Sequence, residues 1–233
     1  MITLNPSEKK RKTKKTTETE PPAETDSPLA DFPIVFNMNE PPPDPKDKIR
    51  TIGLYGTIKE EICSEIVFSL IVLDKLGKNI ELKDPSDPES KEIITYEPIE
   101  LIISSYGGSA ADMFSVYDVM RDVRDRCEIH TQGLGKVMSA AVLLLAAGTK
   151  GKRRIGRHCR VMIHGVISGQ HGDLSDLENE MEEAKWTQQQ YVKALAKETS
   201  MSQKYIKTLI DKKMNVYLTA QASVDLGIAD III

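Results

Sequence analysis

Short apolar segments alternate with longer segments of helical periodicity from Ile49 to the end of the chain, and this alternation constrains the fold most strongly. Apolar runs predict strands at residues 50–56, 98–104, 128–132 and 160–164, and an isoleucine-rich strand at the carboxyl end. Apolar side chains at helical spacing predict helices at residues 58–76, 113–123, 139–147, 174–197, 203–213 and 218–227. In the last of these, Thr219 is expected near the start and Gly227 at the end. Such repeated alternation favours an α/β fold with a mainly parallel sheet.

The composition changes sharply near Lys48. Nine of the twelve prolines lie before residue 46, and all fourteen glycines lie after residue 52. The segment before Lys48 begins with a basic run and continues with a Thr/Glu/Pro-rich stretch, which buries too little apolar surface to offset the entropy lost on ordering. We therefore predict a disordered basic and then proline-rich extension over residues 1–48, and one folded domain over residues 49–233.

Three segments have more than one interpretation or no regular pattern. The basic run at residues 9–15 suits contact with nucleic acid or with an acidic partner surface, and equally suits a solvated run of charges. An apolar patch at residues 32–36 is able to dock on the folded domain or on a partner. The polar stretch at residues 77–97, which contains two prolines, is expected to form an insertion at the surface.

Charge, hydropathy and cysteine content exclude several classes of protein. The 31 basic and 35 acidic side chains give a net charge of −4, which disfavours a general nucleic-acid binder. No apolar run approaches the roughly 18 residues of a membrane-spanning helix, and no apolar stretch follows the first charges as in a secretory signal. These features predict a soluble, cytoplasmic protein. Cys63, Cys127 and Cys159 form no CxxC pair, so we expect buried thiols rather than disulfides or a zinc site.

Three features place donor or reactive groups at strand ends or helix starts, where α/β proteins build their sites. Gly107 and Gly108 follow an apolar strand, where they form either a simple turn or a cradle of backbone N–H groups. Ser139 opens an apolar helix, where its hydroxyl serves as an N-cap or as a nucleophile. His164 ends a strand before a glycine-rich segment, as a structural residue or a base. Together these residues are the parts of an acyl-transfer site.

Five short motifs follow one another in a fixed order. They are Tyr106-Gly107-Gly108, Met138-Ser139-Ala140-Ala141, residues 146–153 (AAGTKGKR), residues 160–164 (RVMIH), and Leu218-Thr219-Ala220 through residues 227–230 (GIAD). Ser139 and His164 are 25 positions apart. In these motifs, their order and this spacing, residues 50–233 resemble the proteolytic subunit of the Clp protease family. The resemblance implies a crotonase-like fold of repeated ββα units, with a protruding handle helix at residues 174–197.

The resemblance also implies roles for individual residues of this sequence. Ser139 corresponds to the nucleophile and His164 to the general base, and the backbone N–H groups of Gly108 and Ala140 correspond to the oxyanion hole. Substrate-binding positions fall on three glycines: Gly107, Gly165 and Gly169. The resemblance implies neither a cofactor nor a metal.

One departure from the family pattern falls in the site itself. The third catalytic residue of the family is an aspartate two positions before the aromatic residue that precedes the Leu-Thr-Ala motif, and Asn215 stands there. An amide oxygen is able to orient the His164 imidazole but carries no charge to stabilise the imidazolium, so low activity is expected. Asp211, about one helical turn earlier, is an alternative source of that charge. Ser105 and Tyr106 also replace the Asn/Ser-Pro pair that usually precedes the glycines in the family.

The resemblance implies a serine-type endopeptidase, the proteolytic subunit of an ATP-dependent compartmentalised protease. Such subunits cleave unfolded polypeptides that an AAA+ unfoldase ATPase supplies. They assemble as a stacked double ring, here a homo-tetradecamer or a mixed assembly with a related subunit, in the cytoplasm, the host cytoplasm or an organelle stroma. A weakly active or inactive ring subunit with a structural or regulatory role is the first alternative because of Asn215. An acyl-CoA enzyme on the related crotonase scaffold is the second, which the spacing of Ser139 and His164 disfavours.

Overall fold

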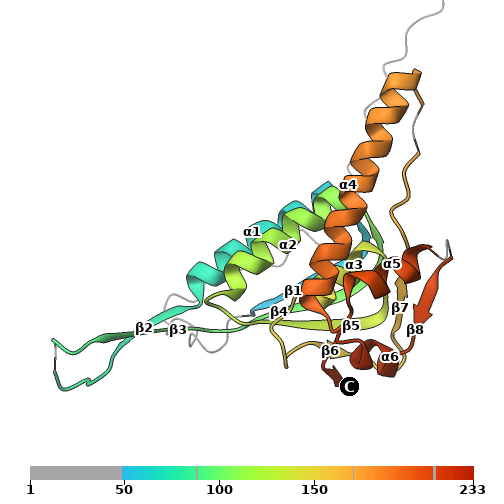
Figure 1. Cartoon of the computed structure of the whole chain (residues 1–233). Coiled ribbons are helices and arrows are strands. Elements are labelled where there is room, and N and C mark those ends of the chain that lie inside the picture. Colours follow the sequence, from blue (N-terminus) through green and yellow to red (C-terminus); the bar gives the residue numbers. More distant parts are fainter. Residues whose placement is uncertain (1–48, 88, 170, 212–213) are drawn as a thin grey trace, which may run out of the picture. The chain divides into compact units, whose positions relative to one another are not determined.

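The computed structural model describes residues 49–87, 89–169, 171–211 and 214–233. The predictions for residues 1–48 lie outside these ranges. Figure 1 shows the elements in chain order. They are β1 (Thr51–Ile58), α1 (Glu60–Leu76), β2 (Lys78–Leu82), β3 (Glu92–Tyr96), β4 (Ile99–Gly108), α2 (Ala110–Arg124), β5 (Ile129–Met138), α3 (Ala140–Ala146), β6 (Arg154–Ile155), β7 (Arg160–Ile163), α4 (Leu174–Glu198), α5 (Gln203–Asp211), β8 (Val216–Leu218), α6 (Ala220–Asp225) and β9 (Ile231–Ile232).

The described strands form a seven-stranded sheet and a separate two-stranded sheet. In the larger sheet, β1, β4, β5, β6 and β9 lie in that order and pair in parallel. Strand β7 pairs in parallel with the last residues of β5, and β8 pairs antiparallel with β7. This arrangement confirms the predicted α/β fold with its mainly parallel sheet.

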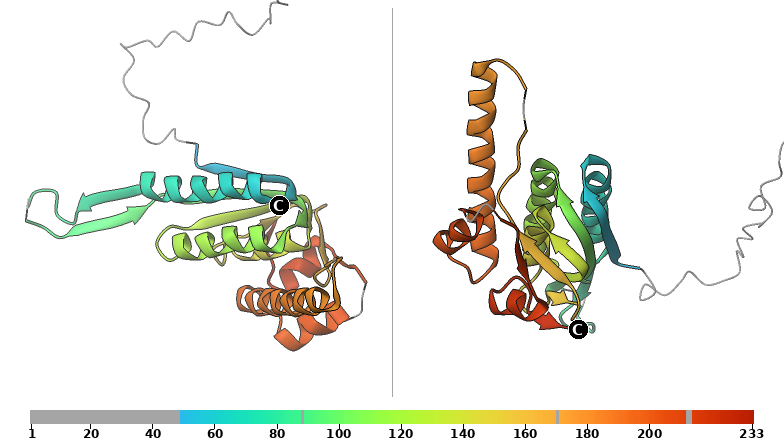
Figure 2. Two further views of the ribbon diagram at one scale, coloured as in Figure 1. Left: turned by 90° about the horizontal axis from the view of Figure 1, so that it is seen from above. Right: turned by 90° about the vertical axis from the view of Figure 1, so that its right-hand side faces the viewer.

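Helices α1 and α2 lie side by side along one face of the sheet (Figure 2). Each turns an apolar stripe toward the core, which in α2 comprises Met113, Val116, Tyr117, Met120 and Val123. Helix α3 is buried on all sides, as its wholly apolar sequence requires. Strand β4 turns every second side chain toward the core in its first half, where those of residues 99, 101 and 103 are fully buried. The hydrophobic periodicity of the sequence therefore located the core correctly.

The three cysteines are buried and none of them forms a disulfide. Burial raises the pKa of the Cys159 thiol to about 11, so this thiol is neutral and unreactive at physiological pH. The prediction that the cysteines act as small apolar core residues is confirmed.

Several elements differ from the sequence prediction. The described residues of the stretch 78–97 are mostly exposed, as expected, but they include the antiparallel hairpin of β2 and β3. Strand β5 does not end in a turn after residue 132; it continues through Gly133 and Gly135 to Met138. Strands β6 and β8 were not predicted, because strands of two or three residues show no usable periodicity. At the end of the chain, Thr219 caps α6 by accepting a hydrogen bond from the Ala222 N–H, as expected.

Helix α4 is the protruding element that the resemblance implied (Figure 1). Its amino-terminal half is exposed, and Asp173 caps it through a hydrogen bond to the Asp176 N–H. Its carboxyl-terminal half is anchored in the domain by the buried side chains of Tyr191, Val192 and Leu195. Among the described residues, no helix combines the length and the apolar character that a membrane span requires.

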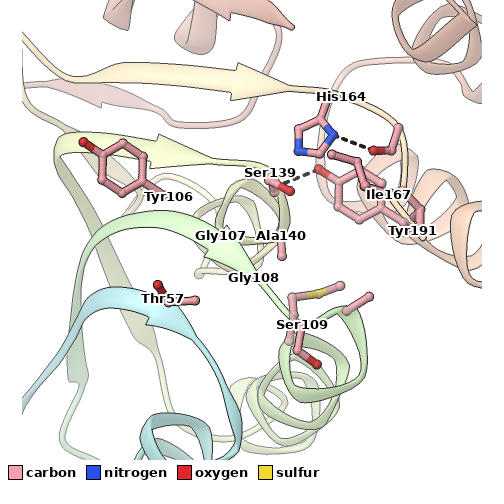
Figure 3. A pocket seen from close by; sticks show the side chains of 14 residues that line it. Thr57, Tyr106, Gly107, Gly108, Ser109, Ser139, Ala140, His164, Ile167 and Tyr191 are labelled. Carbon is pink, nitrogen blue, oxygen red and sulfur yellow. Dashed lines mark hydrogen bonds between the residues drawn. The ribbon is translucent and has the colours of Figure 1, made fainter. Parts of the chain in front are cut away.

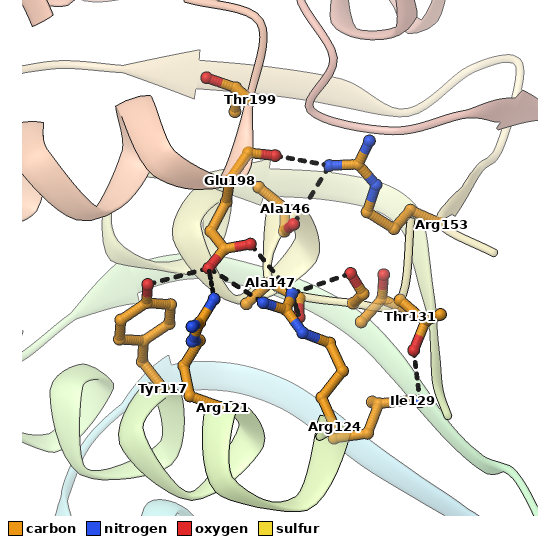
Figure 4. Close-up of polar contacts among 12 residues, drawn as sticks. Tyr117, Arg121, Arg124, Ile129, Thr131, Ala146, Ala147, Arg153, Glu198 and Thr199 are labelled. Atoms are coloured by element: carbon orange, nitrogen blue, oxygen red, sulfur yellow. Dashed lines mark hydrogen bonds and ion pairs between the residues drawn. The ribbon is translucent and has the colours of Figure 1, made fainter. Parts of the chain in front are cut away.

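A buried ion cluster fixes the last residue of α4 to helix α2 (Figure 4). The Glu198 carboxylate, only 1% exposed, accepts hydrogen bonds from Tyr117 at 3.0 Å and from Arg121 and Arg124 at 2.9 Å. Burial alone would raise the pKa of Glu198, but the bonds from Arg124, Tyr117 and Arg121 lower it overall. Arg124 also donates to the carbonyl groups of Ala147 and residue 148, which ties the cluster to the end of α3.

Candidate active site

One cavity of about 400 Å³ collects most of the predicted site residues (Figure 3). Its lining includes Ser139, Ala140, His164, Gly107, Gly108 and Gly165, which come from β4, the turn from β5 into α3, and the segment after β7. Gly169 is not among the lining residues, and among described residues other than its chain neighbours no atom lies within 4 Å of the place where its Cβ would be. Asn215 lines a neighbouring cavity instead. The fold thus brings together residues that are up to 58 positions apart in the sequence.

Ser139 lies at a sharp turn between the end of β5 and the start of α3. Its φ of 55° and ψ of −125° place it in a backbone region that residues with a side chain rarely adopt, and no other non-glycine residue of the described ranges has a positive φ. Strain of this kind is about 1–3 kcal/mol and persists only where the surroundings enforce it. A strained serine between a strand and a helix is the geometry of a nucleophile elbow.

The surroundings of Ser139 account for this backbone conformation. Its N–H donates to the Met162 carbonyl on β7 at 2.7 Å, and its carbonyl accepts from the Val142 N–H and from the Tyr191 hydroxyl at 3.2 Å. Burial raises the pKa of the Tyr191 phenol, so the hydroxyl stays protonated and able to donate. The Ser139 hydroxyl makes no capping bond to α3, so the N-cap interpretation of this serine is wrong. The backbone N–H and carbonyl groups of Ser139 are thus both hydrogen bonded, whereas its hydroxyl does not cap the helix and is left for another role.

Gly107 and Gly108 form the opposite wall of the cavity, and each position requires glycine. Their φ values are +91° and +153°. A Cβ on Gly107 would lie 2.6 Å from the Ser139 Cβ, and one on Gly108 would lie 2.1 Å from the carbonyl oxygen of Ile58. The close approach of this strand end to the serine therefore depends on the absence of side chains.

The buried Ser105 side chain holds this glycine pair from behind. Its hydroxyl donates to the Gly56 carbonyl at 2.6 Å and accepts from the Gly107 N–H at 3.0 Å. Tyr106, which stands where the family usually has proline, is 65% exposed at the cavity edge, and the Lys136 ammonium lies 4.6 Å from its ring centroid. Sequence reasoning noted both residues as departures but missed the anchoring role of Ser105, which depends on a contact 49 positions away.

His164 projects from the end of β7 between the two cavities. Its Nδ1 is hydrogen bonded to the carbonyl oxygen of Gly165 (Figure 3). No hydrogen bond within the described ranges joins the imidazole to the Ser139 hydroxyl. The two side chains nevertheless line one cavity, and apo geometry of a catalytic pair is commonly looser than in the substrate complex.

The second cavity, of about 520 Å³, lies behind the imidazole and is lined by Asn215, Asp211, Gln188 and His164 among others. Asn215 and Asp211 are both exposed to solvent. In the described part of the chain, neither side chain is hydrogen bonded to the imidazole. Within the same ranges, no three His, Cys, Asp or Glu side chains are grouped so that they could hold a metal ion.

The fold and the strained serine at a strand-to-helix turn define an α/β protein of the crotonase-like class with a candidate acyl-transfer site. The family model for Clp protease matches residues 91–233. Similar proteins include the ATP-dependent Clp protease proteolytic subunit 1 of Prochlorococcus marinus subsp. pastoris, 32% identical over 184 residues, which are 79% of this chain and 83% of the relative. The ATP-dependent Clp protease proteolytic subunit 2 of Corynebacterium jeikeium is 32% identical over 182 residues, covering 78% and 77% of the two chains. The chain therefore belongs to the Clp protease family and is a Clp protease subunit.

Proposed function

We propose that this Clp protease subunit is a serine endopeptidase in which Ser139 is the nucleophile and His164 the general base. The observation that carries the proposal is the strained elbow of Ser139, whose free side chain lines one cavity with His164 and the glycine pair. Strain of this size at a residue whose hydroxyl caps nothing points to a catalytic rather than a structural serine.

The proposed reaction uses groups that surround the cavity. The Ser139 oxygen attacks the carbonyl carbon of a peptide bond while its proton passes to Nε2 of His164. The oxyanion that forms accepts hydrogen bonds from the N–H groups of Gly108 and of Ala140, the first residue of α3, whose N–H has no partner within the helix. His164 then gives the proton to the leaving amine, the peptide C–N bond breaks, and water hydrolyses the acyl-enzyme by the same steps.

Asn215 takes the third position of the proposed site, where the family has an acid. A neutral amide does not stabilise the imidazolium by charge, so we expect the rate of the chemical step to be low for this class of enzyme. Gly107, Gly165 and Gly169 are proposed to lie along the bound substrate. The first two line the cavity, which supports their place in the proposal.

The proposed substrate is an unfolded polypeptide, supplied by an AAA+ ATPase to a closed ring of subunits. The names of the relatives include the words "ATP-dependent" and "proteolytic subunit", which supports this part of the proposal. Large apolar side chains of α1 and α4 are exposed in the single chain, among them Phe68 at 68% and Trp186 at 55%. Apolar surface of this kind is typical of subunits that assemble.

The proposal is tested by hydrolysis of an unstructured protein by the purified assembly, with and without Ser139→Ala. We expect the variant to lose at least about 10³-fold in kcat, because it lacks the attacking oxygen, and to keep its assembled mass. A Ser139→Ala variant that cleaves at the wild-type rate would exclude Ser139 as the nucleophile.

A catalytically silent subunit is the second candidate function. It is favoured by Asn215 and by the lack, among described residues, of a hydrogen bond between Ser139 and His164. Mixed assemblies with an active related subunit separate the two functions. If the chain is silent, assemblies that contain wild-type chain and assemblies that contain Ser139→Ala turn over equally; if it is a peptidase, the first kind is faster.

A further inference from the structure

The hydrogen bond at Nδ1 of His164 determines which nitrogen of the ring carries the proton. The partner of Nδ1 is the carbonyl oxygen of Gly165, and a carbonyl oxygen only accepts hydrogen bonds. Nδ1 is therefore the protonated nitrogen, and in the neutral ring Nε2 keeps its lone pair. This is the tautomer that a general base acting through Nε2 needs.

The Gly165 carbonyl is held in place by one side chain of α4. Residues 164–169 form no helix or strand, so the sheet does not fix this peptide. Instead, the Val166 N–H donates to Oε1 of Gln188 at 3.1 Å. A Cβ on Gly165 would lie 2.9 Å from both Gln188 Oε1 and Ile210 Cγ2, so the peptide between residues 165 and 166 is wedged between α4 and α5.

Asn215, at the position of the family's acid, makes no such contact. It is exposed, lines the cavity behind the ring, and is not hydrogen bonded to the imidazole in the part of the chain that the structure describes. Among the described residues, the acceptor that is hydrogen bonded to the imidazole is thus the backbone carbonyl of its own neighbour, Gly165.

We propose that the Gly165 carbonyl, positioned by Gln188, orients the His164 imidazole in place of a side chain at position 215. Gln188 is a positioning residue: it acts on the peptide that accepts the Nδ1 proton and does not touch the reacting atoms. The inference rests on the proposed role of His164 as the base, and it makes Gln188, rather than Asn215, the side chain on which the tautomer depends.

Nitrogen NMR of the assembly labelled with ¹⁵N-histidine tests the tautomer without any need for activity. The chain has four histidines, and a His164→Gln variant identifies the signal of His164 by subtraction. We expect the Nδ1–H tautomer in the wild type and in Asn215→Ala, and a mixture of tautomers in Gln188→Met, which keeps the side-chain length but removes the acceptor. An Nε2–H tautomer in the wild type, or its appearance in Asn215→Ala alone, would overturn the inference.

Peptide turnover gives a second and separate test. We expect Gln188→Met to lower kcat about tenfold with KM changed less than twofold, and Gln188→Glu, which keeps an acceptor for the Val166 N–H, to stay within about threefold of the wild type. Gln189→Met is the matched control, because Gln189 is exposed on the same helix; we expect wild-type turnover and assembled mass.

The two tests separate failure of the inference from failure of the proposed function. Equal loss in the Met and Glu variants of Gln188 would show that packing and not the hydrogen bond matters, and would overturn the inference. A wild-type assembly with the Nδ1–H tautomer and no turnover on any polypeptide would refute the proposed function but leave the assignment of the Nδ1 proton intact.

Discussion

The two halves of the candidate site are built in different ways. The nucleophile half, which comprises the end of β4, the end of β5 and helix α3, combines a helix that is buried throughout with two glycines, Gly107 and Gly108, that have no room for a Cβ. The imidazole half, which comprises residues 164–169 and 171–173, contains no helix or strand in these described residues and exposes Ile167 to 83%. The core of the chain therefore fixes the serine and the glycine pair, whereas a few contacts from α4 and α5 fix the base.

Helix α3 shows how the nucleophile half is secured. Its start is tied to β7 through the Ser139 N–H, and the carbonyl groups at its end accept hydrogen bonds from Thr131, Arg153 and Arg124. Within the described ranges, residues 165–169 form fewer such bonds, namely the one from the Val166 N–H to Gln188 and the one between the Gly165 carbonyl and His164. The core therefore holds the strained Ser139 even in the isolated chain. The position of His164, in contrast, is sensitive to small changes in α4 and α5.

The largest effect on activity is expected from Gly108→Ala, which changes the nucleophile half. The added Cβ would lie 2.1 Å from the Ile58 carbonyl oxygen, a backbone atom of β1 that accepts a hydrogen bond from the Ser109 N–H, so the backbone itself would have to shift. We expect loss of at least about 10²-fold in kcat, because the displaced strand end no longer presents its N–H group to the oxyanion. Peptide turnover and thermal unfolding measure this.

The matched change in the imidazole half is Gly169→Ala. Apart from the chain neighbours of Gly169, no described atom lies within 4 Å of the added Cβ, so the free energy of unfolding should change by less than about 0.5 kcal/mol. If Gly108→Ala retained wild-type turnover, or if Gly169→Ala were the more destabilising of the two, the contrast between the halves would be wrong.

The next largest effect is expected from Glu198→Gln, which weakens the ion cluster behind α3. Glu198 is 1% exposed and pairs with Arg121 and Arg124, so removal of its charge should lower the free energy of unfolding by about 3 kcal/mol at neutral pH. The pKa of Glu198 is lower in the folded chain than its ordinary value of 4.5. Its contribution is therefore fully present above about pH 4.5 and is lost as the pH falls through the folded-state pKa.

Thermal unfolding of wild type and Glu198→Gln between pH 7 and pH 3 tests this dependence. The difference in Tm should be largest at neutral pH and should shrink below about pH 4.5. A difference that stays constant over this range would mean that the cluster is held by packing rather than by charge.

Asn215→Asp in the imidazole half is expected to have a smaller effect, and it should raise rather than lower the activity. A carboxylate in the cavity that His164 lines would stabilise the imidazolium, and we expect a rise in kcat of about tenfold, limited by the exposure of this position to solvent. Asn215→Ala should lower kcat less than twofold, because the Gly165 carbonyl holds the Nδ1 proton. A large loss in Asn215→Ala would show that the amide is needed and that the base is fixed in a different way.

The sequence was sufficient to predict the alternating elements, the core and the gathering of Ser139, His164 and the glycine pair at one end of the sheet. These features follow from hydrophobic periodicity and from the rule that the carboxyl ends of parallel strands share an edge. The wide spacing of the cysteines and the lack of a CxxC pair argued against disulfides, and their burial followed from the apolar character of a free thiol.

The remaining features depend on contacts between distant residues, which no local pattern reveals. The positive φ of Ser139 results from the pairing of β5 with β7 and from the Tyr191 hydroxyl, 52 positions away. The extension of β5 past two glycines was missed because glycine usually marks a turn, whereas here the pairing of residues 136–138 with β7 continues the strand. Gln188 gave no signal at all, since a glutamine on an amphipathic helix is ordinarily a solvated residue.

The most direct test of the account is reaction of the purified assembly with a fluorophosphonate, followed by peptide mass mapping. We predict one phosphonyl adduct on Ser139, abolished in Ser139→Ala and slowed by at least about 10²-fold in His164→Ala, because the serine oxygen loses its base. An adduct on a different residue, or labelling of Ser139 at the same rate without the imidazole, would contradict the claim that His164 activates this serine.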